Sequence, residues 1–122
     1  MITSGTLYYV GMTNNFIRRI QQHNGHLKGG AKFTKRSQEW SPVLIIDGFQ
    51  TKSEAMKCEW ALKTHRGNNF RGIMGRFQRL DQLLVKNQWT STSDNISDQT
   101  LTLYVTEKYK DKVTVPTKEL EW

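Results

Sequence analysis

The stretch Thr6-Leu7-Tyr8-Tyr9-Val10-Gly11 stands directly before an amphipathic pattern, and these two segments together decide how the fold is interpreted. Its β-branched and aromatic residues predict a strand that ends at Gly11. Asn14 is a good N-cap for a helix over Asn15–Asn24, and Gly25 is a suitable stop. Because the helix follows the strand so closely, we expect their side chains to meet above one sheet surface.

The rest of the chain predicts further strands and helices. Pro42–Ile46 is apolar on both faces, which predicts a strand that is central in its sheet. Thr51-Lys52-Ser53-Glu54 fits a capping box and predicts a helix that runs to about His65. Three more elements are expected: a helix over about Gly75–Lys86, a strand over Leu101–Val105 and a short strand over Val113–Val115.

A chain of 122 residues and 14.2 kDa has room for one domain. We expect an α/β (α+β) fold with a small, mostly antiparallel central sheet flanked by helices. Residues 1–88 are predicted to form the domain core, and residues 89–122 a linker and a C-terminal strand extension that packs on the same domain. The tail from Thr106 is expected either to cover the sheet edge or to contact a partner.

Composition excludes several classes of protein. Cys58 is the one cysteine, which excludes an internal disulfide and a multi-cysteine zinc ribbon. No apolar run approaches the roughly 18 residues of a membrane span, and no secretory signal pattern is visible. We therefore expect an intracellular protein of the nucleus or cytoplasm. Four side chains are expected in the core without a further role: those of Cys58, Trp40, Trp60 and Trp89.

Positive charge is concentrated in the first three-quarters of the chain. Residues 1–88 contain 14 Lys and Arg against 5 Asp and Glu, whereas residues 89–122 contain 4 against 6, so the balances are +9 and −2. A basic surface of this kind most often meets a phosphate backbone, although a basic domain without such a partner is the alternative.

Glu59 is predicted to lie on the apolar side of its helix. At about 100° per residue it falls between Ala55 and Met56 on the helical wheel. A carboxylate in that position needs a cation, a metal ion or a proton to compensate its charge. An ordinary ion pair with Lys63, one turn further on, is the alternative.

Arg19 and His23 are four residues apart and so share one helix face. With Tyr9 they could deprotonate a water molecule and hold a phosphate, because arginine offers a two-pronged donor to phosphate oxygens. The alternative is a polar rim beside the apolar stripe of Phe16, Ile17 and Ile20.

Residues 26–39 form a basic loop that contains Gly29-Gly30. Glycines permit a ligand to approach the backbone closely, and Phe33 could stack on a base. Four cations are expected to contact phosphates: Lys28, Lys32, Lys35 and Arg36. A flexible basic loop without a ligand is the alternative.

In this order, the segments resemble the GIY-YIG nuclease family. Tyr9-Val10-Gly11 is similar to the second half of the motif that names the family, and Thr13 stands where the family usually has threonine. The resemblance is closer still to Slx-type structure-specific endonuclease subunits, and it covers about Gly5 to Val105. Six blocks carry it: Gln21–Gly25, Gly29–Ala31, Ile45–Phe49, Glu59–Ala61, Leu83-Leu84 and Leu101–Leu103.

This resemblance implies metal-dependent phosphodiester hydrolysis in branched or flapped DNA, one strand at a time. It implies that Glu59 holds one Mg²⁺ or Mn²⁺ and that Arg19 stabilises charge on the phosphate. Tyr9, helped by His23, would then activate or orient the attacking water. A scaffold-protein partner is implied as well.

Two features depart from the family pattern. One cysteine is too few for the zinc-binding domain that follows in eukaryotic Slx-type subunits and supports contacts to their scaffold partner.

The second departure is at the N-terminus. Ser4-Gly5 predicts a hairpin turn with only three residues before it, so the strand with the first half-motif and its tyrosine is expected upstream of Met1. Tyr8 cannot replace that tyrosine, because neighbours on a strand point to opposite faces. Either the chain starts downstream of the natural one, or it has lost a residue that the family uses.

Two other functions remain open at this level. The chain could be a non-catalytic module of the same fold that binds branched nucleic acid without cutting it. Its nucleic-acid substrate could also be RNA.

Overall fold

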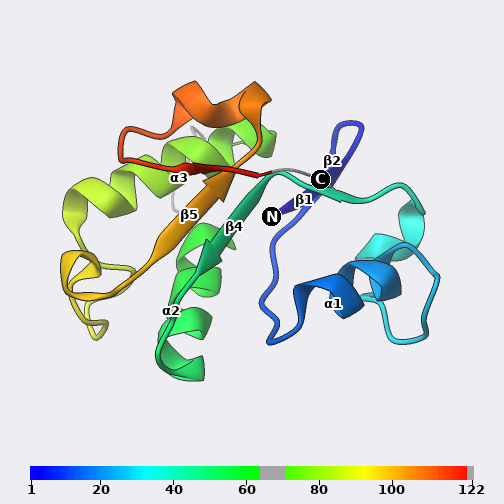
Figure 1. Cartoon of the computed structure of the whole chain (residues 1–122), viewed down its shortest axis with the longest axis horizontal. Helices are drawn as coiled ribbons and strands as arrows, with labels where there is room; N and C mark the ends of the chain where they lie inside the picture. Colours follow the sequence, from blue (N-terminus) through cyan, green and yellow to red (C-terminus); the bar gives the residue numbers. More distant parts are fainter. Residues whose placement is uncertain (64–70, 121–122) are drawn as a thin grey trace.

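The computed structural model describes residues 1–63 and 71–120. Helices and two small sheets make the expected α/β (α+β) architecture (Figure 1). The chain order is β1 (Ile2–Ser4), β2 (Leu7–Tyr9), α1 (Phe16–His23), η1 (Phe33–Arg36), β3 (Ser41–Pro42), β4 (Leu44–Asp47), α2 (Lys52–Lys63), α3 (Gly72–Lys86), η2 (Ile96–Asp98), β5 (Thr102–Val105), η3 (Glu107–Lys112) and β6 (Lys118–Glu119), where η marks a 3-10 helix. Within these residues, no helix has the length and apolar character that a bilayer crossing needs.

The N-terminal sheet has the strand order β2-β1-β3, with antiparallel neighbours. Its hairpin places Ile2 opposite Tyr9 and turns at Gly5, whose φ of 59° suits a residue without a Cβ. The predicted turn is therefore confirmed, but the expectation that its first strand lies wholly upstream of Met1 is wrong. Three residues suffice for β1 because both of its edges are paired, and none of the three is a tyrosine.

Residues 41–47 pass from one sheet to the other. The continuous central strand predicted over Pro42–Ile46 is divided into β3 and β4, each at the edge of its own three-stranded sheet. At the division, the amides of Val43 and Leu44 donate to the carbonyl of Met1, and the amide of Thr106 donates to the carbonyl of Val43. The backbone of Val43 thus connects the two sheets. Residues 42–46 are therefore all apolar although they do not form one long strand.

The second sheet has the order β4-β5-β6. β4 and β5 are antiparallel, whereas β6 pairs in parallel with β5, so the C-terminal tail covers a sheet edge. The strand predicted over Val113–Val115 is absent there, because the chain forms η3 and then a loop before β6. Val113 instead contributes its buried side chain to the core.

Helices α2 and α3 pack against the β4–β5 strands, as Figure 1 shows, and enclose the main core. A smaller core of Ile2, Ile20 and Trp40 lies beneath α1. Trp40, Trp89 and Cys58 are buried as predicted. Two expectations are wrong, since Trp60 and Ile17 have 57% and 56% of their surface exposed. Both lie on helix faces that turn away from the sheets.

The helix starts are close to the predictions. Asn15, rather than Asn14, caps α1, and its Oδ1 accepts the amide of Arg18 at 3.1 Å. At α2, the amide of Glu54 donates to the hydroxyl of Thr51 at 3.2 Å, as in the first half of a capping box. The predicted end of this helix near His65 lies outside the described residues.

Candidate active site

Tyr9, Arg19, His23 and Glu59 line one cavity of about 450 Å³. They come from three elements, since Tyr9 ends β2, Arg19 and His23 lie on α1, and Glu59 lies on α2. Much of the remaining wall is apolar and includes Val10, Ile20 and Leu44. The fold therefore brings the four residues together around a partly apolar cavity, where charged groups interact more strongly than in water.

The ring of Tyr9 is held by neighbours on two sides. Its centroid lies 4.9 Å from that of His23 and 6.4 Å from that of Phe33. Gly11 is close as well, because a Cβ at that position would lie 2.8 Å from Cε1 of Tyr9. A glycine two residues after the tyrosine therefore lets the ring lie across the backbone beside the cavity.

His23 is 5% exposed, and its Nδ1 lies 2.8 Å from the hydroxyl of Thr34. Burial, reinforced by the positive charge of Arg19, lowers the pKa of His23 from 6.5 to about 4. The imidazole is consequently neutral at physiological pH and able to accept a proton.

Arg19 is half-buried between the cavity and the basic loop. Its Nη1 donates to the carbonyl of Gly29 at 2.7 Å and to Oε1 of Gln22 at 3.0 Å. In the described part of the chain these bonds involve Nη1 alone, so Nε and Nη2 keep their donors for another acceptor. The guanidinium is thus fixed in position and can still bind a phosphate.

Glu59 is half-buried, and Oε1 forms an ion pair with Nζ of Lys63 at 2.7 Å. The ion pair with Lys63, which the sequence left open as the alternative, is therefore present, and Glu59 also lies on the cavity wall. Lys63 also lies over the ring of Tyr9, with Nζ 5.4 Å from the centroid. Ion pairs one helical turn apart contribute only about 0.3–0.5 kcal/mol at an exposed site, so a divalent cation can displace this lysine.

The donors of the cavity fit a hard divalent ion that keeps open positions. Among residues 1–63 and 71–120, no group of three or more His, Cys, Asp and Glu side chains is arranged to hold a metal. Mg²⁺ is commonly bound by one or two carboxylates, with water and substrate phosphates as its other ligands, whereas a structural zinc site requires four protein ligands. Glu59 fits the first of these arrangements.

Asp47 is a cavity residue that sequence reasoning did not single out. Its exposed side chain lines the same cavity at the end of β4. A carboxylate directly after an apolar strand was the signal available, because strand ends are common positions for functional groups.

The four cations of the basic loop are all exposed: Lys28, Lys32, Lys35 and Arg36. Lys28 and Lys35 line a second hollow of about 440 Å³ that also reaches His23. Phe33 packs against the smaller core and has Cζ of Arg36 4.7 Å from its ring centroid, so it does not stand free to stack on a base.

Gly30 connects the basic loop to α1. A Cβ at this position would lie 2.5 Å from the carbonyl oxygen of Gln22, so only glycine permits the contact. Gly30 therefore lets the loop pack closely on the helix, and the approach of a ligand to the backbone of this loop stays a prediction.

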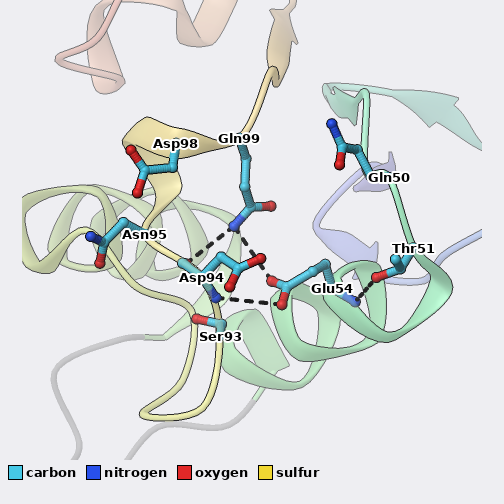
Figure 2. Close-up of a pocket in the computed structure, with 8 residues that line it drawn as sticks. All are labelled: Gln50, Thr51, Glu54, Ser93, Asp94, Asn95, Asp98 and Gln99. Carbon is cyan, nitrogen blue, oxygen red and sulfur yellow. Dashed lines mark hydrogen bonds between the residues drawn. The ribbon is translucent and has the colours of Figure 1, made fainter.

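An acidic hollow of about 600 Å³ lies elsewhere, between the start of α2 and the linker (Figure 2). Glu54 is its buried carboxylate, and Asp94 and Asp98 add negative charge. The amide of Asp94 and the side-chain amide of Gln99 both donate to Glu54 at 3.4 Å, and Lys57 pairs with it at 3.4 Å. These hydrogen bonds attach the linker to α2, and the negative charge of the hollow would repel a phosphate.

The residues of the cavity and the fold around it identify the class of the protein. The family described as the GIY-YIG catalytic domain matches residues 1–72, more than half of the 122 residues. The chain belongs to this family, and the resemblance seen in the sequence is confirmed.

Slx-type relatives make the match more specific. The chain is 57% identical over 58 residues to the structure-specific endonuclease subunit SLX1 of Yarrowia lipolytica, a match that covers 45% of this chain and 20% of the relative. It is 48% identical over 84 residues to the corresponding subunit of Aspergillus terreus, covering 65% and 22%. A third match, to the SLX1 homolog of Giardia intestinalis, is 50% identical over 52 residues and covers 43% and 14%. The chain thus spans about a fifth or less of the length of these relatives.

Proposed function

We propose that the chain is a divalent-metal-dependent endonuclease that cuts one strand of branched or flapped DNA. The observation that carries this proposal is the convergence of Tyr9, Arg19, His23 and Glu59 on one cavity. Family membership supports hydrolysis of phosphodiesters, and the names of the relatives support a branched substrate.

In this proposal, Glu59 provides the protein ligand for Mg²⁺ or Mn²⁺ after Lys63 releases it. When bound, the ion supplies Lewis-acid stabilisation of the scissile phosphate and of the leaving oxygen. The free donors of Arg19 bind the same phosphate and stabilise the charge that develops in the transition state.

Tyr9 orients the attacking water, and neutral His23 accepts its proton. Tyr9 and His23 are close enough to act on one water, since their ring centroids are 4.9 Å apart. Burial in the cavity wall keeps His23 in the base form, in agreement with its lowered pKa.

DNA is held by the basic loop in this proposal. Its four exposed cations lie on a loop that contacts α1 through Arg19 and Gly30. A strand bound to this loop would therefore be held beside the cavity that Arg19 lines. These contacts position the strand without reading its sequence.

A protein partner and a location in the nucleus or cytoplasm belong to the same proposal. The relatives are named as subunits, which supports assembly with a second protein. A DNA substrate supports the location.

A nicking assay tests the function. The purified chain is incubated with flap, fork, four-way and linear duplex DNA, and with flap RNA, in Mg²⁺, Mn²⁺ or EDTA. We expect single nicks in the branched DNA substrates with either ion and none in EDTA. Tight binding without cutting would identify a binding module, and selective cutting of RNA would reassign the substrate; either result would reject the proposed function.

A further inference from the structure

Thr34 is the one residue of η1 whose side chain is fully buried. It has no exposed surface, whereas Lys35 and Arg36 beside it are exposed. A buried hydroxyl in a basic surface loop needs hydrogen-bond partners, because an unpaired one costs about 1–3 kcal/mol. Its partners determine what this residue does.

The hydroxyl of Thr34 is in contact with two polar atoms. Its oxygen lies 2.8 Å from the carbonyl oxygen of Ala31 and 2.8 Å from Nδ1 of His23. A carbonyl oxygen has no proton, so the single hydroxyl proton of Thr34 must go to Ala31. The hydroxyl oxygen can therefore only accept from His23, and the imidazole proton must be on Nδ1.

This assignment determines the state of the other ring nitrogen. A neutral imidazole has one proton, so Nε2 carries a lone pair when Nδ1 is protonated. In the described chain no hydrogen bond involves Nε2, and His23 lines the cavity beside Tyr9. Nε2 is therefore the atom of His23 that can accept a proton from water or from the phenol.

Thr34 is itself held in place by a buried tryptophan. Nε1 of Trp40 donates to the carbonyl of Thr34 at 2.8 Å. The backbone of Trp40 is in turn fixed to Asn24, whose Nδ2 donates to its carbonyl at 3.0 Å and whose Oδ1 accepts its amide at 2.6 Å. Because Asn24 directly follows His23, the helix end and the loop are joined around this one histidine.

We propose that Thr34 is a positioning residue that fixes His23 as the Nδ1-protonated tautomer and so directs the basic lone pair to Nε2. The consequence for catalysis rests on the proposed nuclease function, whereas the tautomer itself does not. Orientation of an imidazole by a hydrogen bond at its other nitrogen is a general requirement when histidine acts as a base.

Nuclear magnetic resonance of the ¹⁵N-labelled histidines tests the tautomer directly. In the wild-type chain at pH 7 we expect the Nδ1 of His23 to have the shift of a protonated nitrogen and Nε2 that of an unprotonated one. Thr34→Ser keeps the hydroxyl and should preserve this pattern. Thr34→Val has nearly the same shape without the hydroxyl, and its His23 should become a mixture of tautomers.

Single-turnover nicking of a flap substrate with Mg²⁺ gives the second readout. We expect Thr34→Val to slow cutting by about 10- to 100-fold with DNA affinity unchanged, and Thr34→Ser to restore the rate. Thermal unfolding shows whether each variant is folded. If Thr34→Val does not fold, the wild-type and Thr34→Ser spectra still decide the tautomer.

Two results would overturn the inference: a proton on Nε2 in the wild-type chain, or wild-type cutting by a folded Thr34→Val whose His23 is a mixture of tautomers. If the wild-type chain does not cut at all, the proposed function fails, and the spectrum still judges the tautomer. The two failures are therefore distinguishable.

Discussion

The cavity and the acidic hollow each place a glutamate of α2 in a recess, but the two carboxylates have different surroundings. Glu54 accepts from the amide of Asp94 and from Gln99, and pairs with Lys57, so its charge is compensated within the protein. Glu59 has an ion pair with Lys63 and lines the same cavity as a phenol, an imidazole and a guanidinium. A carboxylate bound on several sides stabilises a fold, whereas one with a displaceable partner can exchange it for a ligand.

The largest expected effect comes from Glu59. Glu59→Gln should slow nicking by about 10³-fold or more, because losing the ligand of a catalytic ion removes about 4 kcal/mol of transition-state stabilisation. DNA binding should remain. The measurement is a single-turnover nicking assay on a flap substrate with Mg²⁺.

Glu54→Gln is the matched control, since it makes the same change one turn and a residue earlier on α2. It should cut at nearly the normal rate and lose about 1–2 kcal/mol of stability in urea unfolding, because its hydrogen bonds to the linker weaken. Equal losses of nicking in the two variants would remove the distinction between the two regions.

Arg19→Ala should slow nicking by about 10²–10³-fold, the usual cost of removing one donor to transition-state charge. Arg18→Ala removes the same charge from an exposed neighbour on α1 and should leave the rate within a few-fold. The same nicking assay checks both, and a near-normal rate in Arg19→Ala would exclude this residue from the mechanism.

Replacing Lys32, Lys35 and Arg36 together by alanine should weaken DNA binding more than it slows the chemical step. The slope of log affinity against log salt should become shallower by up to about 2–3, since each lost phosphate contact contributes about 0.9. Binding isotherms at several salt concentrations measure this slope. The control variant replaces three cations of η3 by alanine, namely Lys108, Lys110 and Lys112, and should leave the salt slope unchanged. Equal changes of slope in the two variants would show a general effect of net charge and no specific phosphate contact by the basic loop.

Much of this fold was predictable because local sequence patterns determine it. The strand at Tyr9 and the cap at Thr51 depend on contacts nearby in the sequence. The leucines of α3 pack against distant elements, but their helical spacing is itself a local pattern. The division of residues 41–47 between two sheets was not predictable, since it depends on Met1 and Thr106, which are distant in sequence. The exposure of Trp60 escaped prediction for a similar reason, because only the assembled sheets show which face of α2 they cover.

The candidate site divides in the same way. Arg19, His23 and Glu59 could be chosen from helical spacing and family resemblance, and the structure places them on one cavity with Tyr9. The roles of Thr34 and Gly30 could not, because a buried threonine and a glycine packed on Gln22 have no signature in one sequence. Their roles arise from contacts between a loop and a helix.

The last prediction concerns acid stability, which does not depend on the proposed activity. His23 has a pKa of about 4 in the folded chain and about 6.5 unfolded, so the unfolded state binds more protons between these values. The stability that neutral His23 contributes is therefore fully present above pH 6.5 and should be lost as the pH drops toward 4. The free energy of unfolding is measured in urea at pH 7, 5.5 and 4.5. The loss caused by protonation of His23 should be seen in the wild type and in the exposed-site control His26→Gln, but not in His23→Gln. An identical decline in all three would contradict the burial of a neutral imidazole.

The central claim is that Glu59, and not Glu54, is the carboxylate that holds a divalent ion. Titration of Mn²⁺ followed by electron paramagnetic resonance measures this directly in the wild-type chain, Glu59→Gln and Glu54→Gln. The account predicts one bound ion in the wild type and in Glu54→Gln, and its loss in Glu59→Gln. Retention of the ion by Glu59→Gln, or its loss in Glu54→Gln, would contradict the account.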